Sequence, residues 1–299
     1  MTAPRDVPPS PSPSPPATPR AAHWRLRTLA LDLPRRPLVM GILNVTPDSF
    51  SDGGRFFEPA AAAAHGLRLA AEGADILDVG GESTRPYSRP VEAGEELRRV
   101  MPVLAALCEQ VRIPVSIDTT KAAVAREAIA AGAEILNDVT ALTGDPAMTG
   151  LAAETGVGVV AMHMLGTPRS MQEDPTYRDV VGEVLDYLRR RRDALLAAGI
   201  AQDRIALDPG IGFGKTTAHN LALVGNARRL HELGCPILIG HSRKRFLREV
   251  LGDPGADLTA GTVGVALALA RQGVQILRVH DVGPVRQALL LFEAAGGLV

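Results

Sequence analysis

The chain has 299 residues, of which 46% are hydrophobic and 22% are charged, and its formal net charge is −1. This near balance argues against a broad basic surface for nucleic acid or a membrane, and no apolar run reaches the ~20 residues of a membrane span. The two cysteines, Cys108 and Cys235, stand outside any C-x-x-C pattern. We therefore expect buried free thiols and a reducing, cytoplasmic compartment.

The chain begins with MTAPRDVPPSPSPSPPATPR, a proline- and serine-rich stretch that has almost nothing to bury. We predict that residues 1–22 form a disordered, partly polyproline-like tail, although a ligand for an SH3-type domain is an alternative. The stretch has no apolar central segment, so we do not expect a secretory signal. Trp24 to Leu33 alternates apolar and polar residues and predicts a short hairpin strand.

From Pro37 onward, short apolar runs alternate with helical patterns, and this makes eight strand–helix pairs. The runs are apolar on both faces, as parallel strands covered by helices must be. No nucleotide fingerprint follows the first run, which argues against a doubly wound sheet. We therefore predict an α/β fold in which residues 23–299 form a single (β/α)₈ TIM barrel. Six helical patterns end in a glycine typical of C-terminal caps, at Gly73, Gly132, Gly156, Gly199, Gly234 and Gly273.

The ends of the predicted strands carry polar residues, and in this architecture the carboxyl ends of the strands surround the active site. Any one of these residues could be a helix cap, and for Asp118 before TTK that alternative is serious. A series that includes amides, imidazoles and a cation is not what capping alone selects. We therefore predict a site formed by Asn44, Asp78, Asp118, Asn137, His163, Asp208, Ser242, Arg278 and His280.

Asp118, Asn137 and Asp208 are expected to converge on one cavity. Buried carboxylates need hydrogen-bond donors, so the ligand should present several N–H groups, as an amino-oxo heterocycle does. A divalent metal held by carboxylates is the alternative, against which Asn137 and Lys244 argue weakly.

Basic residues gather at the last two strands, where barrels of this kind often bind phosphate. Ser242-Arg243-Lys244-Arg245 follows the seventh strand, and Arg278 and His280 belong to the eighth. GFGKT, residues 212–216, does not match a phosphate-binding loop, because Pro209 stands where that pattern needs glycine. Its glycines suit close approach to a flat ligand, with Phe213 as a wall.

Eight motifs, in order, carry a resemblance to a known family: GILNVTPDSFSDGG, DVGGESTRP, SIDTTK, NDVTAL, MHMLGTP, DPGIGFGK, SRK and RVHDV. They span Pro37 to about Gly283 and resemble those of the dihydropteroate synthases. The resemblance implies a (β/α)₈ barrel that forms a homodimer. It also implies that the chain joins (7,8-dihydropterin-6-yl)methyl diphosphate to 4-aminobenzoate, giving 7,8-dihydropteroate and diphosphate in folate synthesis. Sulfonamides compete for the aminobenzoate position in this family.

The resemblance also implies roles for individual residues. Asn44 would bind Mg²⁺ and the diphosphate, while the loop that follows it would act as a lid. Catalysis would fall to Asp118, Lys244, Arg278 and His280, in a dissociative substitution without a covalent enzyme intermediate. The expected substrate-binding residues are Asn44, Asp78, Thr84, Arg85, Pro86, Asp118, Asn137, Met162, Asp208, Phe213, Ser242, Lys244, Arg278 and His280.

Two departures from the family pattern concern the aminobenzoate side. Tyr87-Ser88 replaces a small Gly-Ala pair in the second loop, and Arg245 stands where many members have serine. Arg245 either reaches the aminobenzoate carboxylate or faces solvent at the start of a helix. Two other functions stay open: a non-catalytic pterin-binding paralogue, and a pterin-dependent methyltransferase. The methyltransferase would not be expected to keep Asn44, SRK and RVHD.

Overall fold

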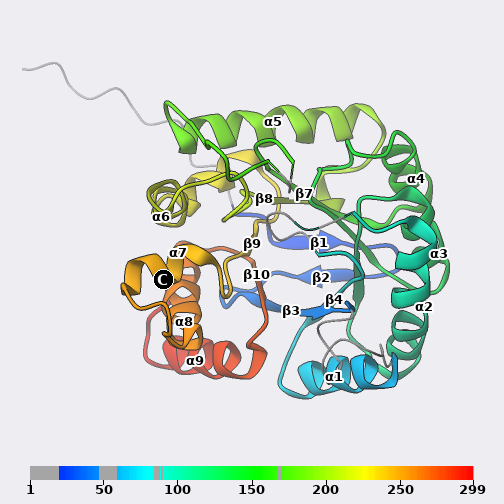
Figure 1. Ribbon diagram of the computed structural model, residues 1–299, viewed down its shortest axis with the longest axis horizontal. Coiled ribbons are helices and arrows are strands. Elements are labelled where there is room, and N and C mark those ends of the chain that lie inside the picture. The colour runs from blue at the N-terminus through cyan, green and yellow to red at the C-terminus, as the bar shows by residue number, and fades with distance from the viewer. Residues whose placement is uncertain (1–19, 47–58, 84–87, 89, 168–169, 299) are drawn as a thin grey trace, which may run out of the picture.

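The computed structural model describes residues 20–46, 59–83, 88, 90–167 and 170–298, and within them a parallel sheet is surrounded by helices (Figure 1). Eight strands of the described chain form this sheet, in the order β8-β7-β6-β5-β4-β3-β10-β9. A parallel bridge between Leu207 and Ile237 joins the two ends of that order, so the sheet closes and the predicted (β/α)₈ barrel is confirmed. The strands are β3 (Leu38–Asn44), β4 (Ile76–Gly80), β5 (Val115–Asp118), β6 (Ile135–Asp138), β7 (Gly158–Met162), β8 (Ile205–Asp208), β9 (Leu238–Gly240) and β10 (Ile276–Val279).

The helices follow the strands in the predicted alternation, with two differences. The stretch HNLALVGNARRLHELG forms two elements, because the helix ends at Gly225 with Asn226 as its C-cap and a tighter 3₁₀ segment follows. A short helix also begins at Arg245; it was not among the eight predicted strand–helix pairs, although one of the two alternatives for Arg245 placed it at a helix start. The helices are α1 (Pro59–Ala71), α2 (Ala93–Gln110), α3 (Ala122–Ala130), α4 (Met148–Thr155), α5 (Val180–Ala197), α6 (Thr217–Gly225), α7 (Arg245–Leu251), α8 (Leu258–Arg271) and α9 (Val282–Ala294), with 3₁₀ segments η1 (Gln202–Arg204) and η2 (Ala227–Leu233). Among the described residues, no helix has the length and apolar character needed to cross a membrane.

The predicted glycine caps explain how the helices turn back toward the sheet. All six glycines have a φ angle between 64° and 116°, in the left-handed region that a residue with a Cβ rarely adopts. Each therefore reverses the chain where a helix must give way to the next strand.

The barrel has two cores, because alternate residues of each strand point to opposite faces of the sheet. Toward the helices, residues such as Leu43, Leu77 and Val159 pack into the larger core. Toward the barrel axis, near the amino ends of the strands, a second cluster fills the interior. Its strand residues are Met40, Ile76, Ile135, Val160, Ala206, Leu238 and Ile276.

The predicted hairpin closes the amino-terminal end of the barrel. Strands β1 (His23–Arg25) and β2 (Ala30–Asp32) pair antiparallel, and the fully buried Trp24 packs into the inner cluster. Its Nε1 donates to the carbonyl of Arg204 over 3.0 Å. Arg20, inside the range that composition assigned to the tail, already contacts the barrel, because its guanidinium donates to the carbonyls of Gly273, Leu33 and Pro34. The cysteines are both free, and Cys235 is fully buried whereas Cys108 is half-buried.

Candidate active site

Polar side chains occupy the barrel interior just beyond the apolar inner cluster. Two residues after Ile76, Ile135, Ala206 and Ile276 come Asp78, Asn137, Asp208 and Arg278, on the same inward-facing side of each strand. The strand period thus turns an apolar floor into a polar layer at the carboxyl ends. This layer opens into a cavity of about 1120 Å³, large enough for two small molecules. Its lining includes Asn44, Asp118, Asn137, Met162, Asp208, Phe213, Ser242, Lys244, Arg278 and His280.

Arg278 is the centre of a buried charge network. Its Nε donates to Asp78 over 2.6 Å and a terminal nitrogen donates to Asp118 over 2.7 Å. Burial by itself would lower the pKa of Arg278, but Asp78 and Asp118 raise it overall. Asp78 is fully buried in the middle of β4 and also accepts a 3.0 Å hydrogen bond from Asn137 Nδ2. Asp78 therefore orients two residues that line the cavity.

Asp118 and Asp208 present carboxylates to the cavity from β5 and β8. Burial raises the pKa of Asp118 to about 7, although the guanidinium of Arg278 acts in the opposite direction. Burial likewise raises the pKa of Asp208 to about 6, and its Oδ1 accepts a 2.7 Å hydrogen bond from the Gly210 amide. Carboxylates this reluctant to ionise are suited to a ligand that supplies N–H donors.

An apolar wall faces these carboxylates. Met162, Phe213, Val139 and Met171 form a separate buried cluster beside the cavity. The ammonium group of Lys244 lies 4.1 Å from the centre of the Phe213 ring, a cation–π arrangement. Burial lowers the pKa of Lys244 to about 8. A flat ligand would find an apolar face and a cation here, next to hydrogen-bond acceptors.

Close approach of Lys244 depends on Gly212. Its φ is +81°, and a Cβ built there would lie 3.0 Å from Cδ of Lys244. Glycine at this position therefore leaves room for the lysine stem. The predicted role of the GFGKT glycines, close approach to a flat ligand, stays a prediction.

Ser242 and His280 contact each other where the chain leaves β9 and β10, and both line the cavity. Ser242 Oγ accepts a 3.2 Å hydrogen bond from the backbone amide of His280 and lies 3.2 Å from its Nδ1. Burial, with nearby Arg278, lowers the pKa of His280 to about 3, so its imidazole is neutral at pH 7. Arg243 also lines the cavity, and its Nε donates to Asp281 over 3.0 Å.

The predicted site residues do not all line the cavity. Asp78 lies beneath Arg278, and Thr84, Arg85 and Pro86 fall outside the described residues, as does the expected lid over residues 47–58. His163, at the end of β7, is buried and contacts Lys215 rather than the cavity carboxylates. Arg245 does line the cavity, but its side chain is 81% exposed and donates to Glu249 over 2.6 Å. Of the two readings of Arg245, this conformation corresponds to the solvent-facing one.

Some lining residues were not predicted. Lys215 is buried and its Nζ lies 2.9 Å from Nδ1 of His163 and 2.9 Å from the carbonyl of Phe213. Burial lowers the pKa of Lys215 to about 7. Its position in GFGKT could have indicated a role for Lys215, but only the glycines and Phe213 of that stretch were given roles. Glu82, Ser83, Ser88 and Gln172 also line the cavity.

A metal held by carboxylates, the alternative to a heterocycle, would require several metal-binding side chains close together. Among the described residues, no group of three or more histidine, cysteine, aspartate or glutamate side chains is placed to hold a metal ion. Asp78 and Asp118 instead share the guanidinium of Arg278.

Comparisons with known proteins agree with this geometry. The family described as pterin binding enzyme matches residues 40–280. A dihydropteroate synthase of Neisseria meningitidis serogroup C is 47% identical over 265 residues, which cover 87% of this chain and 93% of that protein. A solved structure of Xanthomonas albilineans dihydropteroate synthase with 4-aminobenzoic acid has a TM-score of 0.85 and 47% identity, covering 92% of this chain and 98% of that one. A structure of the Xanthomonas albilineans synthase with 7,8-dihydropteroate has a TM-score of 0.82 and 46% identity, again covering 92% and 98%.

Proposed function

The chain belongs to the dihydropteroate synthases, within the pterin binding enzyme family, and we propose that its cavity joins (7,8-dihydropterin-6-yl)methyl diphosphate to 4-aminobenzoate. The products are 7,8-dihydropteroate and diphosphate. The synthase of Xanthomonas albilineans has been solved with 4-aminobenzoic acid and with 7,8-dihydropteroate, and its similarity to this chain supports the same ligands here.

One observation carries the proposal: acceptors and an apolar wall meet in a single cavity. Asp118, Asn137 and Asp208 offer oxygens to the N–H groups along a pterin edge, while Phe213 and Met162 offer apolar surface to its faces. An anionic ligand alone would not require two buried carboxylates. A purely apolar ligand would leave them unsatisfied.

The cations of the cavity suit the diphosphate and the aminobenzoate. Arg278 and His280 would contact the diphosphate, because a guanidinium and a neutral imidazole can both donate to phosphate oxygens. Lys244 and Ser242 would lie near the aminobenzoate. Thr84, Arg85 and Pro86 would complete that side, as the family resemblance implies.

The residues at the end of β3 fit a magnesium ion that is held mainly by its substrate. Asn44 lines the cavity, and within the described part of the chain its side-chain amide makes no hydrogen bond. Mg²⁺ commonly keeps one or two protein oxygens and takes its other ligands from substrate phosphates and water. Asn44 would be that protein oxygen, and the ion, when bound, would neutralise charge on the diphosphate.

The reaction is a substitution at the pterin methylene group. The C–O bond to the diphosphate breaks and its electron pair leaves with the diphosphate, whose growing charge Arg278 and His280 stabilise. The carboxylate of Asp118 stabilises the cation that the pterin ring shares. The aminobenzoate nitrogen then forms the new C–N bond and loses a proton. No covalent bond to the protein forms at any stage.

The decisive experiment incubates the purified protein with both substrates and Mg²⁺ and measures dihydropteroate and diphosphate together. We expect equimolar formation of both, and loss of both when a chelator removes the metal. Pterin binding without either product would instead identify a non-catalytic paralogue. Methyl transfer to a corrinoid would identify the methyltransferase alternative.

We also propose that the chain forms a homodimer, as the family resemblance implies. Light scattering on the purified protein tests this, and a mass of one chain at assay concentrations would contradict it.

A further inference from the structure

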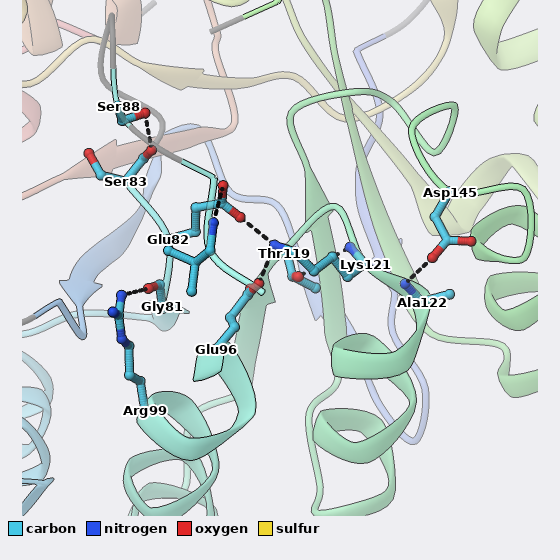
Figure 2. Close-up of polar contacts among 11 residues, drawn as sticks. Gly81, Glu82, Ser83, Ser88, Glu96, Arg99, Thr119, Lys121, Ala122 and Asp145 are labelled. Atoms are coloured by element: carbon cyan, nitrogen blue, oxygen red, sulfur yellow. Dashed lines mark hydrogen bonds and ion pairs between the residues drawn. The ribbon is translucent and has the colours of Figure 1, made fainter. Parts of the chain in front are cut away.

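The described residues of the connection between β4 and α2 line one side of the cavity, and the start of the connection packs closely against α2. Glu82, Ser83 and Ser88, all from this connection, line the cavity. Gly81 lies so close to α2 that a Cβ built on it would stand 2.6 Å from Cγ1 of Val100 and 3.0 Å from Cγ of Glu96. Arg99 also donates to the Gly81 carbonyl over 3.0 Å (Figure 2).

Lys121 joins this connection to the helix behind it. In Figure 2 the side chains of Glu82 and Glu96 converge on Lys121, which lies between β5 and α3. Its Nζ donates to Glu96 Oε2 over 2.6 Å and also to Glu82 Oε2. Burial alone would lower the pKa of Lys121, but the hydrogen bonds to the two carboxylates raise it overall, so the group stays charged.

The position of Lys121 is itself fixed by its neighbours. Its backbone amide donates to Thr119 Oγ1 over 3.3 Å, and the next amide, of Ala122, donates to Asp145 Oδ2 over 2.8 Å. Asp118, which contacts Arg278, is only three residues earlier in the chain. Lys121 is thus anchored to the same turn that presents the cavity carboxylate.

Glu82 holds the two ends of the connection together. Its Oε2 accepts from Lys121, while its Oε1 accepts a 3.3 Å hydrogen bond from the amide of Val91, near the end of the connection. Ser88 Oγ adds a 2.5 Å hydrogen bond to the carbonyl of Ser83. Among the described residues, removal of Lys121 would leave Glu82 with its hydrogen bond to Val91 alone.

Burying the charge of Glu96 carries a desolvation cost that the ion pair with Lys121 need not repay. Glu96 is fully buried, and within the described residues its Oε1 has no hydrogen-bond partner. Replacing a buried ion pair with apolar side chains is often neutral or stabilising, so stability alone does not account for it. What the network does provide is a fixed direction for Glu82.

We propose that Lys121 and Glu96 are positioning residues for the synthase reaction: they hold Glu82 and thereby fix the cavity wall formed by Ser83 and Ser88. This inference rests on the proposed function. In the closed strand order, β4 lies opposite β8, which carries Asp208. The wall therefore lies across the cavity from Asp208, one of the acceptors proposed for the pterin, and it adjoins Asn44 on β3. Asp118, on the neighbouring β5, keeps its hydrogen bond to Arg278 when Lys121 is replaced. Loss of the wall should therefore affect turnover and use of 4-aminobenzoate much more than pterin binding.

The experiment compares Glu82→Gln, Lys121→Met, Lys121→Arg and the double variant Glu96→Gln/Lys121→Met. We expect kcat/KM for 4-aminobenzoate to fall at least ten-fold in Lys121→Met and several-fold in Glu82→Gln. The Kd for a pterin without diphosphate should change less than two-fold. Lys121→Arg should recover most of the activity, because a guanidinium can bridge the same two carboxylates.

The double variant separates positioning from stability. Lys121→Met leaves Glu96 buried without a cation and should lower the melting temperature, whereas neutralising Glu96 as well should restore much of it. Activity should stay low in both. Glu134→Gln is the matched control, since Glu134 is also a buried glutamate but contacts Thr28 at the opposite end of the barrel. We expect Glu134→Gln to lower stability and to leave kcat/KM for 4-aminobenzoate and the Kd for the pterin unchanged.

Hydrogen exchange at Val91 provides a readout that does not require turnover. Its amide bonds to Glu82, so peptides that contain Val91 should exchange faster in Lys121→Met than in Glu134→Gln. Unchanged exchange together with unchanged kinetics in Lys121→Met and Glu82→Gln would overturn the inference. If Lys121→Met speeds exchange but the wild-type protein makes no dihydropteroate, Lys121 does hold Glu82 in place and the proposed function is wrong.

Discussion

Arg278 donates from Nε to Oδ2 of Asp78 over 2.6 Å, which places a guanidinium against a fully buried carboxylate inside the barrel. Within the described residues, Oδ1 of Asp78 has no hydrogen-bond partner. Only Oδ2 of this carboxylate therefore accepts hydrogen bonds within the described residues, from Arg278 and Asn137, and Arg278 is the cation that balances its charge. This contact connects the core of the barrel to the cavity, because Arg278 lines the cavity and Asp78 supports it.

Asp78→Asn should destabilise the fold. The amide removes the charge that matches a buried Arg278, and breaking a buried pair in this way costs about 3–5 kcal/mol. Urea unfolding monitored by circular dichroism measures the change. Asp186→Asn serves as the control, because Asp186 is 59% exposed and its ion pair with Arg189 should contribute less than about 1 kcal/mol. Equal midpoints for the two variants would show that Asp78 is not needed to match Arg278.

Asn44→Ala should weaken use of the metal without affecting the pterin pocket. Loss of one oxygen ligand should raise the Mg²⁺ concentration needed for half-maximal activity by about ten-fold, equivalent to roughly 1.4 kcal/mol. Titration calorimetry with a pterin that lacks the diphosphate should give the wild-type Kd. If that Kd rises as much as the magnesium requirement, Asn44 supports the pterin or the fold and the metal assignment is wrong.

Pterin affinity should fall below about pH 6. Burial raises the pKa of Asp208 to about 6, so the carboxylate is ionised above that pH and binds a proton below it. Only the ionised form offers all of its oxygens to N–H donors, and a bound pterin should therefore compete with the proton. Fluorescence titrations between pH 4.5 and 8 should show the highest affinity near pH 8, a first decline near pH 7 from Asp118 and a further decline below pH 6 from Asp208.

Asp208→Asn is the reference for this pH profile. It removes the titrating group and points a donor at the ligand, so pterin should bind more weakly by about 1–3 kcal/mol at neutral pH. Any remaining pH dependence would then come from Asp118, whose pKa burial raises to about 7. A variant with wild-type affinity would rule out Asp208 as a pterin ligand.

Deletion of residues 1–19 should leave both activity and melting temperature unchanged, because their composition offers almost nothing to bury. Arg20→Ala should differ. Its three hydrogen bonds to backbone carbonyls anchor the chain beside the hairpin, and their loss should cost about 1–2 kcal/mol of stability. Differential scanning calorimetry of the two variants makes the comparison. A deletion that destabilises more than Arg20→Ala would show that the removed residues contribute to the fold.

The elements of the barrel were predictable because local patterns determine them. Strands buried on both faces need continuous apolar runs, and helix ends need glycine where φ is positive, as at Gly156 and Gly234. Helix α7 was not among the predicted strand–helix pairs, because Arg243, Lys244 and Arg245 were interpreted as a basic strand end; a helix start at Arg245 was considered only as one alternative for its side chain. The break at Asn226 was missed because the helical pattern of apolar residues continues through it.

The site was predictable only in part, because some of its contacts join distant residues. Asp78 was placed with the strand-end residues, yet it lies within β4 and contacts Arg278, which is 200 positions away. Glu96 has the sequence position of a solvent-facing acid in the first turn of a helix. Only the packing of α2 against Gly81 buries it and brings it to Lys121. No local pattern carries that information.

Arg245 stands where the resemblance to the family predicts a serine. Its side chain is 81% exposed and bonds to Glu249 one turn along α7, and such exposed pairs contribute about 0.3–0.5 kcal/mol. We therefore expect Arg245→Ser to leave KM for both substrates within two-fold and to lower stability only slightly. Steady-state kinetics with each substrate varied in turn measures this, with Arg248→Ser on the same helix as the control. A selective, several-fold rise in KM for 4-aminobenzoate would mean that the guanidinium leaves Glu249 for the substrate carboxylate, because a charge-assisted hydrogen bond contributes roughly 1.5–3 kcal/mol.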